Sequence, residues 1–416
     1  MKVLFVTWET FPSRTATSNC LFSIVKELNS KGVVCDIVNI SGEYKLSKKS
    51  KVDNSIIYNV FESSFCSIKK IFKRNPFLAI FLSLKRLLGF SINGRENKIS
   101  KKVAKKINVI FSKDIHKYDI TIAVCSHVMN AIVCDRIYDK TKIKYIIYQV
   151  DPISSNVGYK NKKIELIEFN LFRKAKYVIT TPLLYEEIKN NHLYDKFFDK
   201  FFVAEFPNVR NMVFEKPNRS INDRLIFFYS GRFYSHIRDC RYALDVFKDI
   251  NNINFVLLFA GDGQEDVIDD YKARYFGDKI KRLGVISLDE SFSMMKKADV
   301  LINIGNQTSN QVPSKLFDYI STGKIIINFC QSKECPTIPY INRYRLGLNI
   351  IKGEKCIEEY SRIISCFISE NIEKTVPFEE IERKFYKNTA VHVGNVFEKL
   401  LNDDTNFNIS NSKKTY

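Results

Sequence analysis

The 416-residue chain lacks several features that would each indicate a definite class of protein. No apolar run approaches the roughly 20 residues that a bilayer-spanning helix needs. The ten cysteines form no Cys-x-x-Cys pair, and several stand inside apolar runs, as Cys35 and Cys125 do. No repeat recurs at a fixed period. These absences argue against a membrane-spanning protein, a disulfide or metal-binding cysteine framework and a repeat architecture, and they favour a cytosolic protein with reduced, buried thiols.

The first residues also do not predict a secretory signal. Met1 and Lys2 lead directly into a strand-like apolar run (3–6), with no small-residue cleavage site after it. Because 45% of the residues are hydrophobic, the chain is expected to be globular, and its length is sufficient for two domains.

Strand-like apolar runs alternate with helical patterns through most of the sequence. The predicted strands are 2–7, 33–40, 118–125, 143–150 and 177–181, followed by 225–229, 255–260, 300–304 and 324–329. Near-continuous apolar strands separated by helices are typical of parallel sheets covered on both faces. We therefore predict an α/β chain with two Rossmann-like domains, 1–207 and 208–378, that meet near Pro207-Asn208.

Two helices have clear boundaries. Apolar residues recur at helical spacing from Leu21 to Leu28, and Gly32 ends the pattern. A second helix is predicted to begin at Ser287, which can form a capping box with Glu290.

The segment 312–327 carries the strongest functional signal. Pro313 suits the first turn of a helix, and Gly323 can take the left-handed conformation that ends one, so a short helix is predicted from about 314 to 322. Free N–H groups at its start, beside Ser314 and Lys315, would form an anion site.

Asp318 stands one turn further along this predicted helix. A lone carboxylate there can accept hydrogen bonds from a pair of hydroxyls, so phosphate and diol sites about one turn apart predict a nucleotide-sugar ligand. The segment resembles the donor-site motif of the family 4 group of retaining GT-B glycosyltransferases, in which an acidic residue at the position of Asp318 binds the ribose. A solvated carboxylate on a helix surface is the alternative.

Further motifs in residues 224–330 resemble the same family. They are Ser230-Gly231-Arg232, Ala260-Gly261-Asp262-Gly263, Arg282-Leu283-Gly284-Val285-Ile286 and Ala298-Asp299-Val300-Leu301. The resemblance implies a GT-B fold with two parallel sheets facing a central cleft. It also implies backbone contacts from Val285 and Ile286 to the donor base, and a C-terminal helix (379–401) that returns to the first domain. Residues 402–416 are a polar tail.

Departure of a nucleoside diphosphate builds negative charge that cations, N–H groups or a metal must neutralise. The chain contains no Asp-x-Asp pair, so we expect no metal and no other cofactor. Arg232 and Arg238, after the Gly231 turn, can supply the cations, unless they are solvated loop residues. The family often has a lysine where this sequence has Ile237, with Arg238 one position later.

Asn310 stands where the family motif usually has a glutamate, in a polar segment (305–311) suited to binding sugar hydroxyls. It is predicted to contact the donor sugar, the alternative being an ordinary surface loop. Lys315 could reach a phosphate or lie on the surface. The full predicted donor-binding set is Gly231, Arg232, Arg238, Val285, Ile286, Asn310, Ser314, Lys315, Leu316 and Asp318.

Two candidates come from the first domain. Asp151 ends a predicted strand at the edge where α/β sheets bind ligands, and it could stabilise positive charge or accept a proton from the acceptor. With Arg232 it forms the predicted catalytic pair, although an aspartate before a proline is also typical of a turn. His127 is a weaker candidate for binding the acceptor. The family's glycine pair after the first strand is absent, since residues 13–19 read Ser-Arg-Thr-Ala-Thr-Ser-Asn.

A basic segment (67–117) accounts for much of the positive charge. Between Lys69 and Lys117 stand 14 Lys or Arg against two acids, a local net charge of +12 out of +19 for the chain. Apolar residues interleave with these charges, as in a helix that lies in an anionic membrane interface. The alternative is a core-packed helix with a basic solvent-facing side.

Together these signals predict a retaining, metal-independent hexosyltransferase. Its donor would be a nucleotide-sugar and its acceptor a saccharide or lipid-linked saccharide in bacterial surface polysaccharide synthesis. It would be cytoplasmic and peripheral on the inner face of the cell membrane. A nucleotide-sugar epimerase or other GT-B enzyme is one alternative. A basic nucleic-acid-binding protein is another, although no nucleic-acid-binding module is recognisable, so nucleic acid is not expected as a partner.

Overall fold

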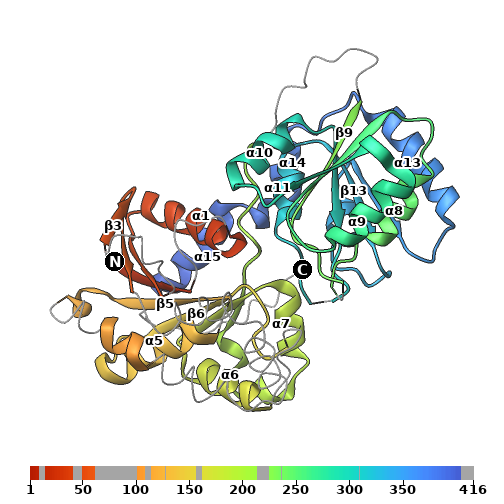
Figure 1. Ribbon diagram of the computed structural model, residues 1–416. Coiled ribbons are helices and arrows are strands. Elements are labelled where there is room, and N and C mark those ends of the chain that lie inside the picture. Colours follow the sequence, from red (N-terminus) through yellow and green to blue (C-terminus); the bar gives the residue numbers. More distant parts are fainter. Residues whose placement is uncertain are drawn as a thin grey trace, which may run out of the picture.

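The computed structural model describes residues 1–8, 15–40, 49–60, 101–107, 114–126, 128–155, 162–212, 224–235, 237–308 and 310–403. These residues form two α/β lobes, each built on one open sheet (Figure 1). Within the described ranges, no helix is both long and apolar enough to span a bilayer.

The first lobe contains an eight-stranded sheet in the order β3-β4-β2-β1-β5-β6-β7-β8. The strands are β1 (Lys2–Thr7), β2 (Val34–Asn39), β3 (Lys49–Val52), β4 (Ser55–Asn59), β5 (Ile120–Cys125), β6 (Tyr145–Gln149), β7 (Tyr177–Thr180) and β8 (Phe201–Val203). All neighbours are parallel except β3 and β4, which form an antiparallel pair at one edge. The helices are α1 (Ala16–Ser30), α5 (Val128–Thr141), α6 (Lys162–Lys174) and α7 (Pro182–Lys189).

The second lobe contains a six-stranded, wholly parallel sheet in the order β11-β10-β9-β12-β13-β14. The strands are β9 (Leu225–Ser230), β10 (Phe255–Ala260), β11 (Ile280–Gly284), β12 (Val300–Ile304), β13 (Ile325–Cys330) and β14 (Gly347–Ile351). The helices are α8 (Arg241–Lys248), α9 (Glu265–Tyr271), α10 (Leu288–Lys297), α11 (Lys315–Ser321), α12 (Ile338–Arg343), α13 (Ile357–Asn371), α14 (Phe378–Lys384) and α15 (Ala390–Asn402).

The predicted α/β class with two parallel sheets is therefore confirmed. β5, β10, β12 and β13 are buried along their whole length, which is why their sequences are apolar at successive positions. Five strands were not predicted: β3, β4, β8, β11 and β14. β11 shows why, since only its first residue is buried and the next four are exposed, so its sequence carries no apolar run.

The local capping predictions are confirmed. Ser287 Oγ accepts a hydrogen bond from the Glu290 amide while the Glu290 carboxylate accepts one from the Ser287 amide, so both partners of the box are present. Gly32 follows α1 with φ +81°, a conformation that costs a side-chain-bearing residue free energy. Of the nine cysteines in the described residues, none is disulfide-bonded and seven are buried, but Cys356 and Cys366 are exposed, contrary to a wholly buried set.

The predicted single helix 379–401 is wrong in its continuity. α14 ends at Lys384, a short 3₁₀ turn follows, and α15 begins after Thr389, whose hydroxyl accepts from the His392 amide and so starts a new helix. α15 lies against α1 of the first lobe (Figure 1), where a Cβ on Gly394 would be 2.3 Å from Glu27 Cγ. The second lobe's chain therefore ends packed on the first lobe.

Candidate active site

Two glycine turns lie at the carboxyl ends of β9 and β10. Gly231 and Gly261 have φ +143° and +133°, and the Gly231 amide donates to the Ala260 carbonyl over 2.8 Å. A Cβ on Gly261 would lie 2.1 Å from the Gly231 carbonyl oxygen, so this close approach requires glycine. The predicted Gly231 turn is thus fixed by backbone packing at the edge of the sheet.

Arg238 directs its guanidinium toward this turn. Its Nε and Nη2 donate to Asn306 Oδ1 over 3.2 and 2.7 Å, and its Nη1 donates to the Arg232 carbonyl over 3.4 Å. A Cβ on Gly231 would lie 3.7 Å from Arg238 Nη1 and 3.0 Å from Lys315 Nζ. Two basic groups therefore converge on one backbone turn.

Lys315 is the second basic group at this turn. Its Nζ donates to the Ser230 carbonyl over 2.8 Å and lies 3.5 Å from the centroid of the Tyr229 ring. Burial, and secondarily the Arg238 charge, lower the pKa of the Lys315 amine well below its usual value. The ring and the carbonyl oppose this, since both favour the ammonium form. An anion at the turn would add to that preference.

Binding of pyrophosphate at this turn is therefore expected to be accompanied by proton uptake by Lys315. Burial lowers the pKa of the Lys315 amine and an added anion raises it again, so the amine binds more protons once the anion is present. Isothermal titration calorimetry at neutral pH in two buffers of different ionisation enthalpy measures the uptake. Lys315→Met should abolish it, whereas Lys333→Met, at an exposed lysine paired with Glu354, should not. Equal uptake in wild type and Lys315→Met would contradict the assignment.

Arg232, unlike Arg238, pairs with a carboxylate. Its Nε lies 3.2 Å from Asp262 Oδ1, its side chain is more than half exposed, and its guanidinium lies 5.2 Å from the centroid of the Tyr234 ring. The structure thus brings Arg238 and Lys315 together at the Gly231 turn and places the Arg232 guanidinium against Asp262 instead.

The start of α11 offers fewer free amides than predicted. The helix has seven residues, and Ser314 before it already has helical φ and ψ. The amides of Leu316 and Phe317 donate to the carbonyl oxygens of Pro313 and Ser314 over 3.0 and 3.1 Å. The Leu316 side chain is fully buried. The basic side chains of Arg238 and Lys315, rather than several free helix amides, are the groups placed to bind an anion here.

Asp318 lies one turn along α11 and is buried. Burial raises the pKa of its carboxyl to about 6, and the guanidinium of Arg210, with Nη2 3.0 Å from Asp318 Oδ1, acts in the opposite direction. The alternative of a solvated carboxylate is therefore wrong. Arg210 could not be found from the sequence, because 108 positions separate it from Asp318.

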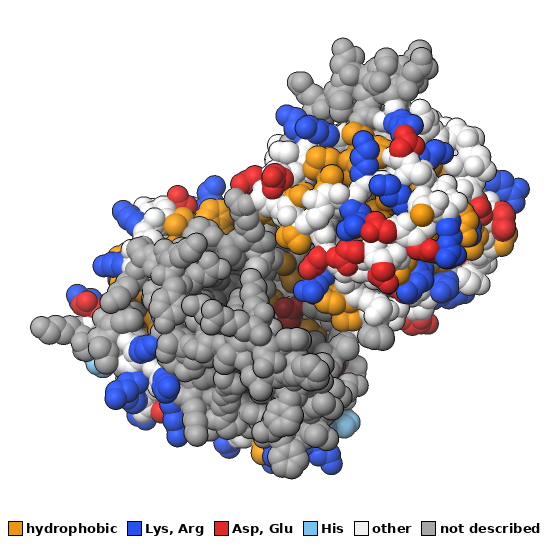
Figure 2. All heavy atoms as spheres, in the orientation of Figure 1, with side chains coloured by type: hydrophobic (Ala, Val, Ile, Leu, Met, Phe, Trp, Pro, Cys, Tyr) orange, Lys and Arg blue, Asp and Glu red, His pale blue; other side chains and the backbone are white. Residues whose placement is uncertain are grey.

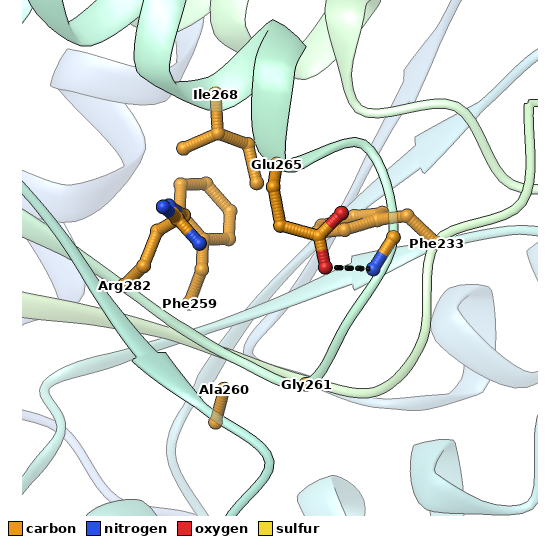
Figure 3. Close-up of a pocket in the computed structure, with 8 residues that line it drawn as sticks. Phe233, Phe259, Ala260, Gly261, Glu265, Ile268 and Arg282 are labelled. Atoms are coloured by element: carbon orange, nitrogen blue, oxygen red, sulfur yellow. Dashed lines mark hydrogen bonds between the residues drawn. The ribbon is translucent and has the colours of Figure 1, made fainter. Parts of the chain in front are cut away.

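The predicted base-contacting residues follow β11, whose Arg282 lines a small depression. Val285 is exposed and Ile286 half-buried at the end of β11. The depression is shallow and is lined by Phe233, Phe259, Ala260, Gly261, Gly263, Glu265, Ile268 and Arg282 (Figure 3). The Glu265 carboxylate accepts from the Gly263 amide over 2.7 Å, as the dashed line marks. This contact ties α9 to the second glycine turn.

Two contacts join the lobes at the carboxyl ends of the strands. Asp151, just after β6, accepts a hydrogen bond from Gln311 Nε2 over 2.5 Å. Asn310 Nδ2 donates to Glu187 Oε2 on α7 over 3.2 Å. The polar segment after β12 therefore faces the edge of the first sheet, as expected for sheets that face a shared cleft. Glu187 carried no recognisable signal in the sequence, and Gln311 was expected only as part of the polar segment 305–311.

Glu168 on α6 is a further buried carboxyl near Asp151. Burial raises its pKa to about 7, although it accepts hydrogen bonds from the Ser154 amide over 3.2 Å and from Gln149 Nε2 over 3.3 Å. Through Ser154 it holds the loop that carries Asp151. His127 lies outside the described residues, as do 67–100 and 108–113 of the basic segment.

Among the described residues, no three His, Cys, Asp or Glu side chains are grouped so that they could hold a metal ion. The prediction that transfer needs no metal or other cofactor stays a prediction.

No family model and no curated protein matches this sequence. Solved structures do match along nearly the whole chain. A sucrose-phosphate synthase from Thermosynechococcus elongatus is 11% identical with a TM-score of 0.66, covering 96% of this chain and 98% of its own. The lipopolysaccharide outer core galactosyltransferase WaaB is 14% identical with a TM-score of 0.57, covering 96% and 99%.

A third structure, the catalytic domain of starch synthase IV from Arabidopsis thaliana bound to ADP and acarbose, is 11% identical with a TM-score of 0.59 and covers 96% of this chain and 98% of its own. At such low identity these likenesses show the fold alone. The two parallel sheets and their neighbours among glycosyltransferases together show that this chain has the GT-B fold.

Proposed function

We propose that this protein is a glycosyltransferase that moves a hexose-type sugar from a nucleotide-sugar to a saccharide acceptor. One observation carries the proposal. Arg238 and Lys315 converge on the Gly231 turn, and Asp318 lies one helical turn from Lys315. Two cations and a buried carboxylate at this spacing suit a diphosphate and the ribose beside it.

The same groups can serve the reaction. As the bond to the anomeric carbon breaks, charge builds on the leaving diphosphate, and fixed cations in a partly buried site stabilise that charge more than water does. Arg238 and Lys315 take this role, and Arg232 adds a third cation if it leaves Asp262. Asp151 faces the same cleft and can stabilise the sugar's positive charge or accept the acceptor's proton. Retention of anomeric configuration and independence of metal and other cofactors belong to the proposal through the family resemblance.

The acceptor and location are also proposed. The basic segment 67–117 would hold the enzyme on an anionic membrane surface, so a lipid-linked saccharide in bacterial surface polysaccharide synthesis is the acceptor class we favour. The name of WaaB refers to a lipopolysaccharide, which supports an acceptor of this kind. The protein would then be cytoplasmic and peripheral on the inner face of the membrane.

Product analysis tests the proposal against its nearest alternative. UDP-, GDP-, ADP- and dTDP-sugars are screened for thermal stabilisation, and the best donor is incubated with and without saccharide acceptors. Transfer requires an acceptor and releases the nucleoside diphosphate, whereas an epimerase changes the donor's sugar with no acceptor. Arg238→Ala and Asp318→Ala should each greatly reduce transfer while the melting transition remains cooperative. Full activity in both variants would overturn the assignment of this site.

The nucleic-acid alternative is less well supported by the described surface. Basic and acidic side chains are intermixed over the visible face of the second lobe (Figure 2), without the single-sign patch that backbone phosphates favour. RNA or DNA binding that survives moderate salt, with no response to any nucleotide-sugar, would nevertheless favour that class.

Removing charge from the basic segment is expected to release the protein from membranes. Each basic residue near an anionic surface contributes about 1 kcal/mol, so six together are ample for reversible binding. The variant replaces Lys69, Lys70, Lys73, Arg74, Lys85 and Arg86 with glutamine. Fractionation should shift from membrane to soluble, and a variant with six glutamines at exposed lysines of the second lobe serves as the control. Unchanged fractionation of the segment variant would refute membrane docking through this segment.

A further inference from the structure

Arg210 lies on the segment that follows β8 and leads into the second lobe, and it is attached to α11 twice. Its amide donates to Ser321 Oγ over 3.2 Å, and its Nη2 donates to Asp318 Oδ1 over 3.0 Å. The guanidinium also lies over the Phe292 ring of α10, 4.6 Å from the centroid. Its position relative to Asp318 is therefore fixed from three sides.

The Asp318 side chain is only 10% exposed, whereas that of Arg210 is 39% exposed. Besides Arg210, the titratable groups that act on this region are the Cys20 thiol from α1, the Tyr319 hydroxyl from α11, the Asp151 carboxylate, which acts on Cys20, and Arg238, which acts on Tyr319. Arg238 is the one cation among these four, and its guanidinium is bonded to Asn306 rather than to Asp318. Within the described residues Arg210 is the cation that contacts the Asp318 carboxylate, and it bonds one of the two carboxylate oxygens.

We propose that Arg210 is a positioning residue that keeps Asp318 an ionised, correctly oriented acceptor for the ribose hydroxyls of the donor nucleotide. Arg210 donates to Asp318 Oδ1, and Asp318 Oδ2 would accept the hydrogen bonds of the ribose hydroxyls. This inference rests on the proposed function and deepens it. It assigns recognition of the ribose hydroxyls to Asp318 and Arg210 together, rather than to Asp318 alone.

The positive charge of Arg210 offsets the effect of burial on Asp318. Burial already raises the pKa of the Asp318 carboxyl to about 6 with Arg210 beside it. Without the guanidinium the pKa must rise further, since Arg210 is the group that favours the charged form. A larger fraction of the carboxyl would then be protonated near neutral pH, and the protonated form is a weaker acceptor. At higher pH it would ionise again.

The experiment compares nucleotides that differ only in the ribose hydroxyls. Dissociation constants are measured by calorimetry for UDP, GDP and ADP and for their 2′,3′-dideoxy forms. The dissociation constant of the dideoxy form divided by that of the parent nucleotide reports the contribution of the ribose hydroxyls. Arg210→Met removes the charge but keeps an apolar side chain over Phe292, and Arg210→Lys retains a cation. Arg343→Met is the control, because Arg343 also lies over aromatic rings, those of Tyr340 and Phe385.

In the wild type the ratio should be about 10 to 100 for the nucleotide that binds best, and it should decline below about pH 6. In Arg210→Met it should fall to about 1 to 3 at pH ~7 and recover toward the wild-type value at pH ~9. Arg210→Lys and Arg343→Met should keep most of the wild-type ratio at pH ~7. Recovery with pH distinguishes lost charge from a damaged fold, since a misfolded site would not regain discrimination.

Three results with Arg210→Met would each overturn the inference: a ratio equal to that of wild type, tighter nucleotide binding, or a ratio that stays lost at high pH. The second would mean that Arg210 competes with the ribose for Asp318. A wild-type ratio of one would overturn it as well, while leaving nucleotide binding intact. Absence of binding by all three nucleotides would instead contradict the proposed function itself.

Discussion

Arg238→Met is expected to lower kcat for sugar transfer by about 10²- to 10³-fold, the range seen when one fixed donor to a developing negative charge is removed. Arg238 is suited to this role because Asn306 holds its guanidinium through two nitrogens, so the group is in place before the reaction begins. Donor affinity should fall less than kcat, since the charge on the phosphates is largest in the transition state. Steady-state kinetics with the donor found by product analysis measure both.

Arg274→Met is the matched control for this loss. Arg274 is an exposed arginine of the same lobe, paired with Asp270 four positions earlier, and its replacement should change kcat by less than about twofold. If Arg238→Met left kcat unchanged and only lowered the melting temperature, Arg238 would be a structural brace of the Gly231 turn. The leaving group would then need another cation.

Gly261→Ala is expected to lower the free energy of unfolding by about 3 kcal/mol or more. Two costs add. The residue has φ +133°, which a side chain disfavours, and its new Cβ would lie 2.1 Å from the Gly231 carbonyl oxygen, a backbone atom that can move only if β9 and β10 separate. Chemical denaturation monitored by circular dichroism measures the change.

Gly353→Ala separates these two costs. Gly353 has φ +87°, but a Cβ there would meet no atom within 4 Å, so only the conformational cost of about 1 to 2 kcal/mol is expected. Equal losses in the two variants would mean that the Gly231–Gly261 contact relaxes easily. The two turns would then not be held together as rigidly as the proposed donor site requires.

Much of the fold was predictable from local sequence. The strands that were found, β1, β5, β10 and β12 among them, are buried on both faces, and burial of successive residues leaves a continuous apolar run that can be read directly. Caps and glycine turns were predictable for a similar reason, since a capping box needs residues only three positions apart. Exposed β11 and the break before α15 were missed, because neither leaves a strong pattern.

The candidate site also has parts that local sequence predicted and parts that it did not. The sequence by itself determined the short-range parts: the Gly231 turn, the helix that carries Lys315 and Asp318, and the arginines after the turn. Only the tertiary structure decided which of these groups meet, placing Arg238 and Lys315 together, Arg232 on Asp262 and Arg210 on Asp318. The physical reason is that the pKa of a buried group and the partner of a charged group depend on neighbours that folding brings close. These neighbours can be far apart in the chain, as Gln311 and Asp151 are, with 160 positions between them.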